Sequence, residues 1–157
     1  METAQHTLSE ALRQVMRLWP SGVTVVAVRY QDEVRGMTVS SFTSVSLEPP
    51  LILVCINQTA QLWPLLEKAG RFSVNLLAEG HEHTSAHFAG QPLEGYQPLT
   101  HEDTPALRGA LATLYCCTWA VYPGSSHKIV VGQVEDVALG NETRPLLYWN
   151  RGYRQLP

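Results

Sequence analysis

Six hydroxyl side chains fall within nine residues of the chain, in the segment TVSSFTSVS at residues 38–46. Hydroxyl groups and the backbone N–H groups beside them can hold a phosphate or the polar edge of a ring without a formal positive charge. The same composition is typical of a serine-rich edge strand that ends in a turn. From the residues alone, this segment is either a binding segment or an edge strand.

A second polar group, Asn57-Gln58-Thr59, follows an apolar segment and precedes a predicted helix. The N-terminus of a helix has free N–H groups and the positive end of the helix dipole, so an anion can bind there. The alternative is that Thr59 only caps the helix.

His127 opens a predicted strand directly after the turn residues 124–126. An imidazole at this position can bind the amide of a cofactor or act as an acid, although many such histidines are only hydrogen-bonded. Tyr153 lies close to Tyr148 and Trp149 on a predicted late strand. It either packs in the core or an interface, or faces a flat ligand.

Other catalytic patterns find little support. His83 and His87 share a helix face with His81 nearby, but no cysteine or carboxylate stands at a supporting spacing, so we expect a solvated helix face rather than a metal site. The sequence has no G-x-S-x-G, G-x-G-x-x-G or Walker motif. A dinucleotide would therefore not be held in the Rossmann manner.

Apolar periodicity and turn residues predict the elements that position these groups. Thr7 and Glu10 have capping-box spacing, and the helix that they begin ends at Pro20. The other expected elements are strands at 23–28, 34–40, 51–56, 110–122, 127–138 and 145–156, a half-exposed strand at 71–77, a helix at 61–69, a surface helix at 79–89, an irregular connection at 91–105, and turns at 31–33, 123–125 and 140–141. Many strands and few helices predict a mainly β fold, a closed antiparallel barrel with helices plugging or flanking it.

Composition bounds the class of protein. The 157 residues, 45% hydrophobic and 16% charged with a net charge of −3, predict one domain over residues 1–157. There is no basic run, so we expect no nucleic acid or anionic membrane as a partner. No apolar run could span a bilayer, and residues 1–6 lack the features of a signal peptide. Cys55, Cys116 and Cys117, an odd number with two adjacent, predict a reducing, cytoplasmic location.

Six segments together resemble the flavin reductase family that supplies two-component monooxygenases. Residues 36–51 read GMTVSSFTSVSLEPPL, similar to the family's GMTANSFTSVSLDPPL. The other segments are LVCIN at 53–57, RFSVNLL at 71–77, HFAG at 87–90, HKIVVGQV at 127–134, and LLYW with YR at 146–149 and 153–154. They cover nearly the whole chain in the expected order.

The resemblance implies an FMN-binding split β-barrel of antiparallel Greek-key type, and a homodimer with flavin sites near the subunit interface. It implies that NADH or NADPH reduces FMN or FAD, which then passes to a partner monooxygenase. His127 matches the family histidine that meets the nicotinamide. The resemblance also carries over the flavin contacts. They are Thr38, Val39, Ser40 and Ser41 at the ribityl chain, ring edge and phosphate, and Ser46 and Leu47 by the isoalloxazine. Further contacts are Ile56, Asn57 and Thr59 toward the phosphate, and Tyr153 at the pocket border.

Some residues depart from the family pattern. Ala60 stands where relatives often have a phosphate-binding serine, and Ser125-Ser126 and Lys128 replace Gly-Asp and threonine around the histidine. The expected reaction is hydride transfer from nicotinamide C4 to flavin N5, with His127 positioning the nicotinamide. Two alternatives stay open: a flavoprotein that retains its flavin and acts on its own substrate, and a non-catalytic flavin- or haem-binding module.

Overall fold

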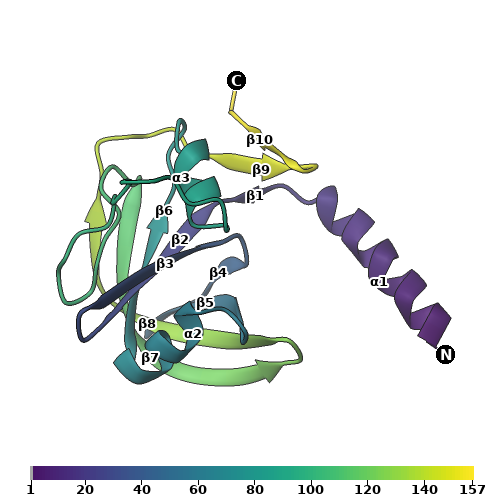
Figure 1. The fold of residues 1–157 in the computed structure, drawn as a ribbon, viewed down its shortest axis with the longest axis horizontal. Coiled ribbons are helices and arrows are strands. Elements are labelled where there is room, and N and C mark those ends of the chain that lie inside the picture. Colours follow the sequence, from purple (N-terminus) through teal and green to yellow (C-terminus); the bar gives the residue numbers. More distant parts are fainter. Residues whose placement is uncertain (1) are drawn as a thin grey trace.

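The computed structural model describes residues 2–157, with side chains described from Thr7 onward. Two antiparallel sheets dominate it (Figure 1). The larger has the strand order β3-β2-β6-β7-β8-β5-β4: β2 (Thr24–Tyr30), β3 (Glu33–Val39), β4 (Phe42–Leu47), β5 (Pro50–Asn57), β6 (Arg71–Leu76), β7 (Ala112–Gly124) and β8 (His127–Leu139). The smaller has the order β1-β9-β10: β1 (Ser21–Gly22), β9 (Leu147–Trp149) and β10 (Gly152–Arg154). The helices are α1 (Glu2–Arg17), α2 (Leu62–Ala69) and α3 (Glu82–His87). The predicted mainly β, antiparallel architecture with flanking helices is confirmed.

Strand β2 is buried on both faces over Thr24–Val28, which explains why residues 25–28 are all apolar. Val26 and Val28 belong to one core cluster, together with side chains from β5, β6, β8 and α2. Val25 and Ala27 point the other way, into a second cluster that includes residues from the 99–110 connection. Alternate residues of a strand face opposite sides of the sheet, so one strand serves two cores.

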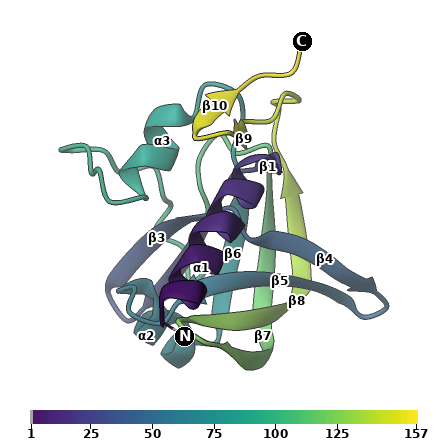
Figure 2. The ribbon, with the colours of Figure 1, turned by 90° about the vertical axis from the view of Figure 1, so that its right-hand side faces the viewer.

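Helix α2 covers one end of the larger sheet, which curls round the first core cluster (Figures 1 and 2). Leu62 and Leu66 of this helix are buried in that cluster. The helix ends as predicted at Gly70, whose φ of 68° lets its N–H donate to the Leu66 carbonyl. None of the helices in the described residues has the length and apolar character to cross a membrane.

The prediction that β6 is half-exposed is wrong. Residues 72–75 are buried on both faces, because the long connection that follows α3 lies over the strand. Ser73 Oγ donates to the Pro105 carbonyl at 2.6 Å, and Leu107 N–H donates to Asn75 Oδ1 at 2.9 Å. The polar side chains of Ser73 and Asn75 favour an exposed face in the sequence. They are bonded instead to a segment some thirty residues later in the chain, which covers the strand.

The predicted surface helix at 79–89 is also corrected. Helix α3 spans only Glu82–His87, and its Thr84 and Ser85 side chains are buried. The Nδ1 atom of His81 accepts a hydrogen bond from the Ala78 N–H at 3.0 Å before the helix begins. The helix is therefore packed into the fold rather than solvated along this face.

Two reversals differ from the expected ones. Strand β7 continues through Gly124, so the turn is Ser125–Ser126, with Ser125 at a φ of 59°. The expected last strand is a hairpin of β9 and β10, whose two turn residues Asn150 and Arg151 both have positive φ. Such short strands need a partner, and β9 finds it in β1.

The three cysteines are free thiols. Cys116 is buried and Cys117 is half-buried, as expected for neighbours on opposite faces of a strand. Burial raises the pKa of the Cys116 thiol to about 12. This thiol therefore stays protonated at neutral pH and packs as a small apolar side chain.

Candidate functional site

Two polar contacts hold the end of β3 against α3 and the residue after it, and a third joins α3 to the last strand. Thr38 Oγ1 donates to the Ser85 carbonyl at 2.7 Å, and Thr38 N–H donates to the Phe88 carbonyl at 3.1 Å. Tyr153 Oη donates to Ser85 Oγ at 2.7 Å. Thr38 and Tyr153, which are far apart in sequence, therefore both bond to Ser85. Val39 follows with its side chain buried in the first core cluster.

The hydroxyl-rich segment is an edge strand. After a break at Ser40–Ser41 it continues as β4, which pairs with β5 on one side and ends the larger sheet. Ser41 Oγ donates to the Cys55 carbonyl at 3.1 Å, and Ser46 Oγ donates to the Pro49 carbonyl at 2.6 Å. These hydroxyls stabilise the strand and its turn. Leu47, 85% exposed, presents a large apolar side chain at this edge.

The ends of β5 and β8 bring Asn57 and His127 opposite each other in the sheet register. Asn57 Oδ1 accepts from Thr59 N–H at 2.9 Å and from Thr59 Oγ1 at 2.8 Å. Ser126 Oγ lies 2.8 Å from His127 Nδ1, and the Ser126 carbonyl accepts from Gln58 N–H at 3.0 Å. These two strand ends therefore form one polar cluster.

Two details of this region differ from what the sequence suggested. The alternative in which Thr59 caps the helix is wrong, because α2 begins at Leu62 and Thr59 bonds to Asn57 instead. The side chain of Ile56 is fully buried in the first core cluster. Only its backbone remains for contact with a ligand.

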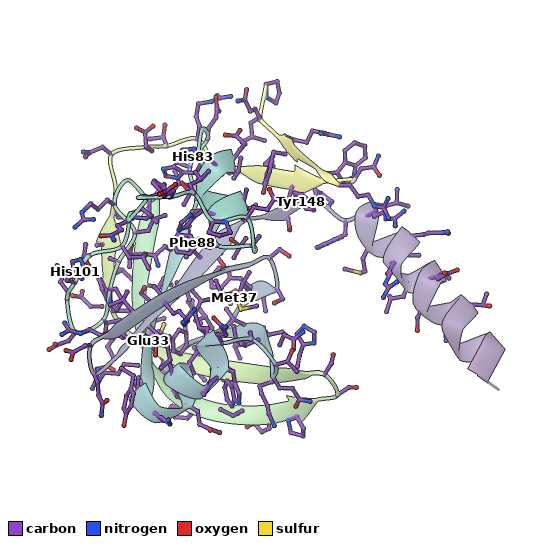
Figure 3. All side chains as sticks on the ribbon, viewed as in Figure 1. Glu33, Met37, His83, Phe88, His101 and Tyr148 are labelled. Atoms are coloured by element: carbon purple, nitrogen blue, oxygen red, sulfur yellow. The ribbon has the colours of Figure 1, made fainter. Side chains whose placement is uncertain are left out.

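A cavity of about 880 Å³ lies between β3, the residues that start α2, and the segment from His87 to His101. Thr38 is the one predicted flavin contact that lines it, and Ala60 lies at its α2 side. The large apolar side chains of its wall include Val34, Met37, Leu62, Phe88 and Leu99. In Figure 3, Met37 of β3 and Phe88 after α3 lie close together near the middle of the molecule.

The backbone of β3 approaches Phe88 closely at Gly36. A Cβ atom at Gly36 would lie 2.7 Å from Phe88 Cε1, so a side chain there would displace the aromatic ring from the cavity wall. The motifs GMT and HFAG, which carried part of the family resemblance, thus meet in space. Sequence reasoning noted both motifs but did not predict that they wall one cavity.

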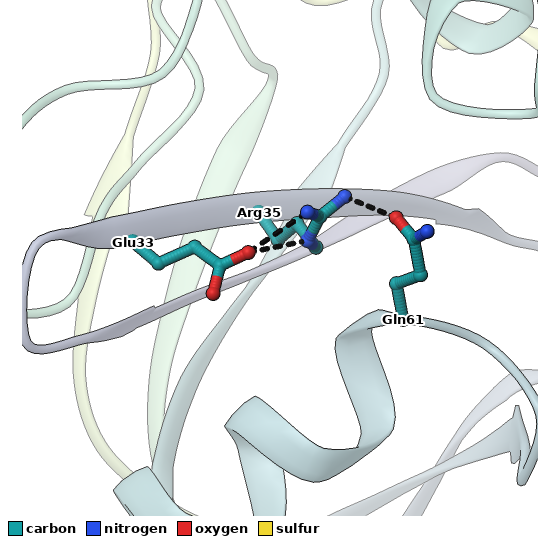
Figure 4. Close-up of polar contacts among 3 residues, drawn as sticks. All are labelled: Glu33, Arg35 and Gln61. Atoms are coloured by element: carbon teal, nitrogen blue, oxygen red, sulfur yellow. Dashed lines mark hydrogen bonds and ion pairs between the residues drawn. The ribbon is translucent and has the colours of Figure 1, made fainter.

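Arg35 is the residue of this cavity that the sequence reasoning missed altogether. Its Nε and Nη2 atoms donate to Glu33 Oε1 at 3.1 and 2.8 Å (Figure 4). Its Nη1 atom donates to Gln61 Oε1 at 2.5 Å, which ties β3 to the start of α2. No local sequence pattern marks this contact, because the two residues lie 26 positions apart.

The imidazoles of His81 and His87 accept hydrogen bonds from backbone N–H groups, and of these two His87 lines the cavity. His87 Nδ1 accepts from Leu93 N–H at 2.8 Å, and burial lowers the pKa of His87. Burial and the nearby charge of His83 lower the pKa of His81. Among the side chains that the structure describes, from Thr7 onward, no group of three His, Cys, Asp or Glu residues has a metal-binding arrangement.

The fold and the site together define a class: a curled antiparallel barrel with a cofactor-sized cavity along β3. The family model described as "Flavin reductase like domain" matches residues 16–157. The chain is 50% identical over 149 residues to the reductase component of 4-hydroxyphenylacetate 3-monooxygenase from Thermus thermophilus, covering 95% of this chain and 97% of the relative. The chain belongs to the flavin reductase like domain family.

Solved structures agree with this membership. The flavin reductase PheA2 superposes with a TM-score of 0.87 and 31% identity, over 94% of this chain and 97% of that chain. The NADH:FAD oxidoreductase SgcE6 from Streptomyces globisporus, solved with NAD and FAD fragments, gives a TM-score of 0.84 and 34% identity, over 93% and 91% of the two chains. The expected split-barrel fold is thereby confirmed.

Proposed function

We propose that this chain is an NADH-dependent flavin reductase that reduces freely exchanging FMN or FAD and supplies the reduced flavin to a partner monooxygenase. The observation that carries this proposal is the likeness to the Thermus thermophilus reductase component over nearly the whole of both chains. The likeness to an NADH:FAD oxidoreductase supports NADH as the hydride donor. Because a fold alone does not define an activity, the residues of the site must also suit it.

The cavity suits a flavin in size and in chemistry. Cofactor pockets commonly enclose roughly 300–1,000 Å³ and are mostly apolar with a few polar groups, and this cavity of about 880 Å³ has that character. Phe88 and Leu99 provide apolar surface, and Thr38 lies in the same wall, with its N–H and hydroxyl donating to the Phe88 and Ser85 carbonyls. When bound, a flavin accepts a hydride from a nicotinamide and passes the electrons on.

His127 positions the nicotinamide in this proposal. The contact with Ser126 Oγ at Nδ1 fixes the imidazole ring and leaves Nε2 for the nicotinamide carboxamide. Asn57 and Thr59 bond to each other across the turn, which keeps the neighbouring backbone in one conformation. Hydride transfer requires alignment of two rings and no general base, so positioning is the contribution we assign to His127.

The other flavin contacts come from the edge strand and its neighbours in this proposal. Leu47 is exposed and can cover a ring, whereas the buried side chains of Val39 and Ile56 leave only backbone groups for contact. The remaining proposed contacts are Thr38, Ser40, Ser41, Ser46, Asn57, Thr59 and Tyr153.

We also propose that the chain functions as a single domain over residues 1–157, as a homodimer, and in the cytoplasm. The three free thiols are consistent with a reducing compartment. The helix α1 supports the homodimer, since its Leu8, Leu12 and Val15 side chains are exposed along one face.

The test is to reduce an excess of FMN or FAD with NADH and the protein under anaerobic conditions, and then to remove the protein by rapid ultrafiltration. The proposal predicts reduced flavin in the filtrate in large molar excess over protein. Flavin reduced but retained with the protein would indicate a flavoprotein with its own substrate. Bound flavin that NADH does not reduce would indicate a binding module.

A further inference from the structure

The cavity carries a single permanent charge on a largely apolar lining. Among the described residues that line it, Arg35 is the one with a permanent charge, and no Asp or Glu lines it. Burial lowers the pKa of His87, which favours its neutral form at neutral pH. A cavity with one cation and no carboxylate among its lining residues favours a ligand that carries an anion on an apolar body.

Arg35 is oriented but not saturated by its neighbours. A guanidinium has five N–H donors, and the bonds to Glu33 and Gln61 use three of them. Among the described residues, the structure gives no acceptor for the other two. Because Gln61 Oε1 accepts from Arg35, the two N–H donors of the Gln61 amide remain for a ligand beside the guanidinium.

The residues just before α2 offer no free hydroxyl to the cavity. Ala60 lines the cavity there, and its methyl group cannot donate a hydrogen bond. Thr59, the nearest hydroxyl in the chain, donates to Asn57 Oδ1. Arg35 and Gln61 are the donors next to this position.

We propose that Arg35, held by Gln61, binds the phosphate group of the nucleotide that occupies the cavity, and so makes the chain prefer phosphorylated flavins to riboflavin. Guanidinium groups bind phosphate through paired N–H bonds. Glu33 competes for the same guanidinium, but both side chains are about half exposed, 51% and 39%, so this ion pair is weak and easily exchanged. The inference rests on the proposed function for the identity of the ligand.

The experiment measures dissociation constants for FMN and riboflavin, by equilibrium dialysis, with the wild type and with the variants R35M, R35K and E33Q. Wild type binds FMN roughly 10- to 100-fold more tightly than riboflavin, the range expected for a charge-assisted hydrogen-bond pair. R35M reduces this ratio to near one and leaves riboflavin binding within about twofold, since only the phosphate contact is lost. R35K gives an intermediate ratio because it keeps the charge without the planar fork. E33Q keeps or increases the ratio.

The matched control is R71M. Arg71 is an exposed residue of β6 that pairs with Glu135 of β8, and it does not line the cavity. The variant leaves the FMN-to-riboflavin ratio unchanged. The KM for NADH distinguishes the source of the phosphate. If R35M raises this KM and leaves the flavin ratio intact, the guanidinium binds the pyrophosphate of the nicotinamide cofactor.

Two results overturn the inference: equal binding of FMN and riboflavin by the wild type, or an R35M variant that keeps the wild-type flavin ratio, whether or not its KM for NADH changes. Failure of the proposed function looks different. In that case the wild type does not oxidise NADH with any flavin, while the binding ratio can still be measured.

Discussion

At the scale of the residue, a short polar contact of a side chain holds each of the two ends of the proposed site. Thr38 is bonded to the carbonyl of Ser85 at one end, and His127 is bonded to Ser126 at the other. The contact at Thr38 joins β3 to α3. The contact at His127 holds the start of β8, which lies opposite Asn57 of β5. Preorganised groups of this kind reduce the entropy lost when a ligand is aligned.

We predict that H127A weakens the use of NADH and leaves flavin binding nearly unchanged. Loss of one hydrogen bond to the carboxamide corresponds to about a tenfold rise in the KM for NADH, with the Kd for flavin within about twofold of wild type because no flavin contact is lost. The control S126A removes only the bond that orients the imidazole and gives a smaller rise. Steady-state kinetics at saturating flavin provide the measurement, and an unchanged KM and turnover in H127A would refute the assigned role.

At the scale of the element, β6 is tied into the fold by one buried amide. Asn75 Nδ2 donates to the Val25 carbonyl and to Ser73 Oγ, each at 2.9 Å. Asn75 Oδ1 accepts from Leu107 N–H at 2.9 Å and from Thr113 Oγ1 at 2.8 Å. The side chain therefore joins β2, β6, β7 and the long connection, and it satisfies all of its hydrogen-bonding capacity.

We predict that N75A lowers the free energy of unfolding by about 2–5 kcal/mol, because the buried Leu107 N–H and its neighbours lose their partners. The control T113V removes one of the four bonds and costs about 1 kcal/mol. Urea denaturation monitored by fluorescence measures both values. A loss in N75A no larger than that in T113V would show that the network does not hold these elements together.

At the scale of the whole molecule, α1 extends away from the body of the barrel (Figure 1). Its end is fixed by bonds from Asn150 N–H to the Arg17 carbonyl and from Trp149 Nε1 to the Leu18 carbonyl. Its exposed apolar face is unfavourable in water, and an isolated helix of this length is only marginally stable. Strand β7 also exposes large side chains at Trp119 and Tyr122, so a second copy offers an apolar surface for the helix.

We predict that L12E converts the protein from a dimer to a monomer, because a carboxylate on the apolar face of α1 would be buried without a partner. The control Q14E places the same charge at an exposed position on another face of the helix and keeps the dimer. Light scattering coupled to size-exclusion chromatography measures the mass. A wild-type monomer, or an L12E dimer as stable as the wild type, would contradict this assembly.

Local sequence patterns predicted those elements that are specified by their own residues rather than by contacts with distant segments. The β-branched run of β2 and the Gly70 stop of α2 are examples, since each is specified by its own residues. The burial of β6 was not predictable, because the segment that covers it follows some thirty residues later. The β9–β10 hairpin was missed because Asn150 and Arg151 adopt positive φ without a glycine.

The candidate site could be predicted only in part, because contacts between distant segments leave no local pattern in the sequence. Individual motifs pointed to Thr38, Asn57 and His127, but the cavity forms only when segments distant in sequence meet. Arg35 and Gln61 carry no motif, and their contact exists because α2 packs at the end of β3. The departure at Ala60 left open how a phosphate would be held, and Arg35 and Gln61 line the cavity together with Ala60.

The most direct test of the central claim is NADH oxidation, followed by absorbance, as free FMN or FAD is added to the purified protein. A reductase of freely exchanging flavin predicts negligible oxidation without added flavin, and a rate that rises and saturates with its concentration over many turnovers per protein. An absence of NADH oxidation at saturating flavin would contradict the account.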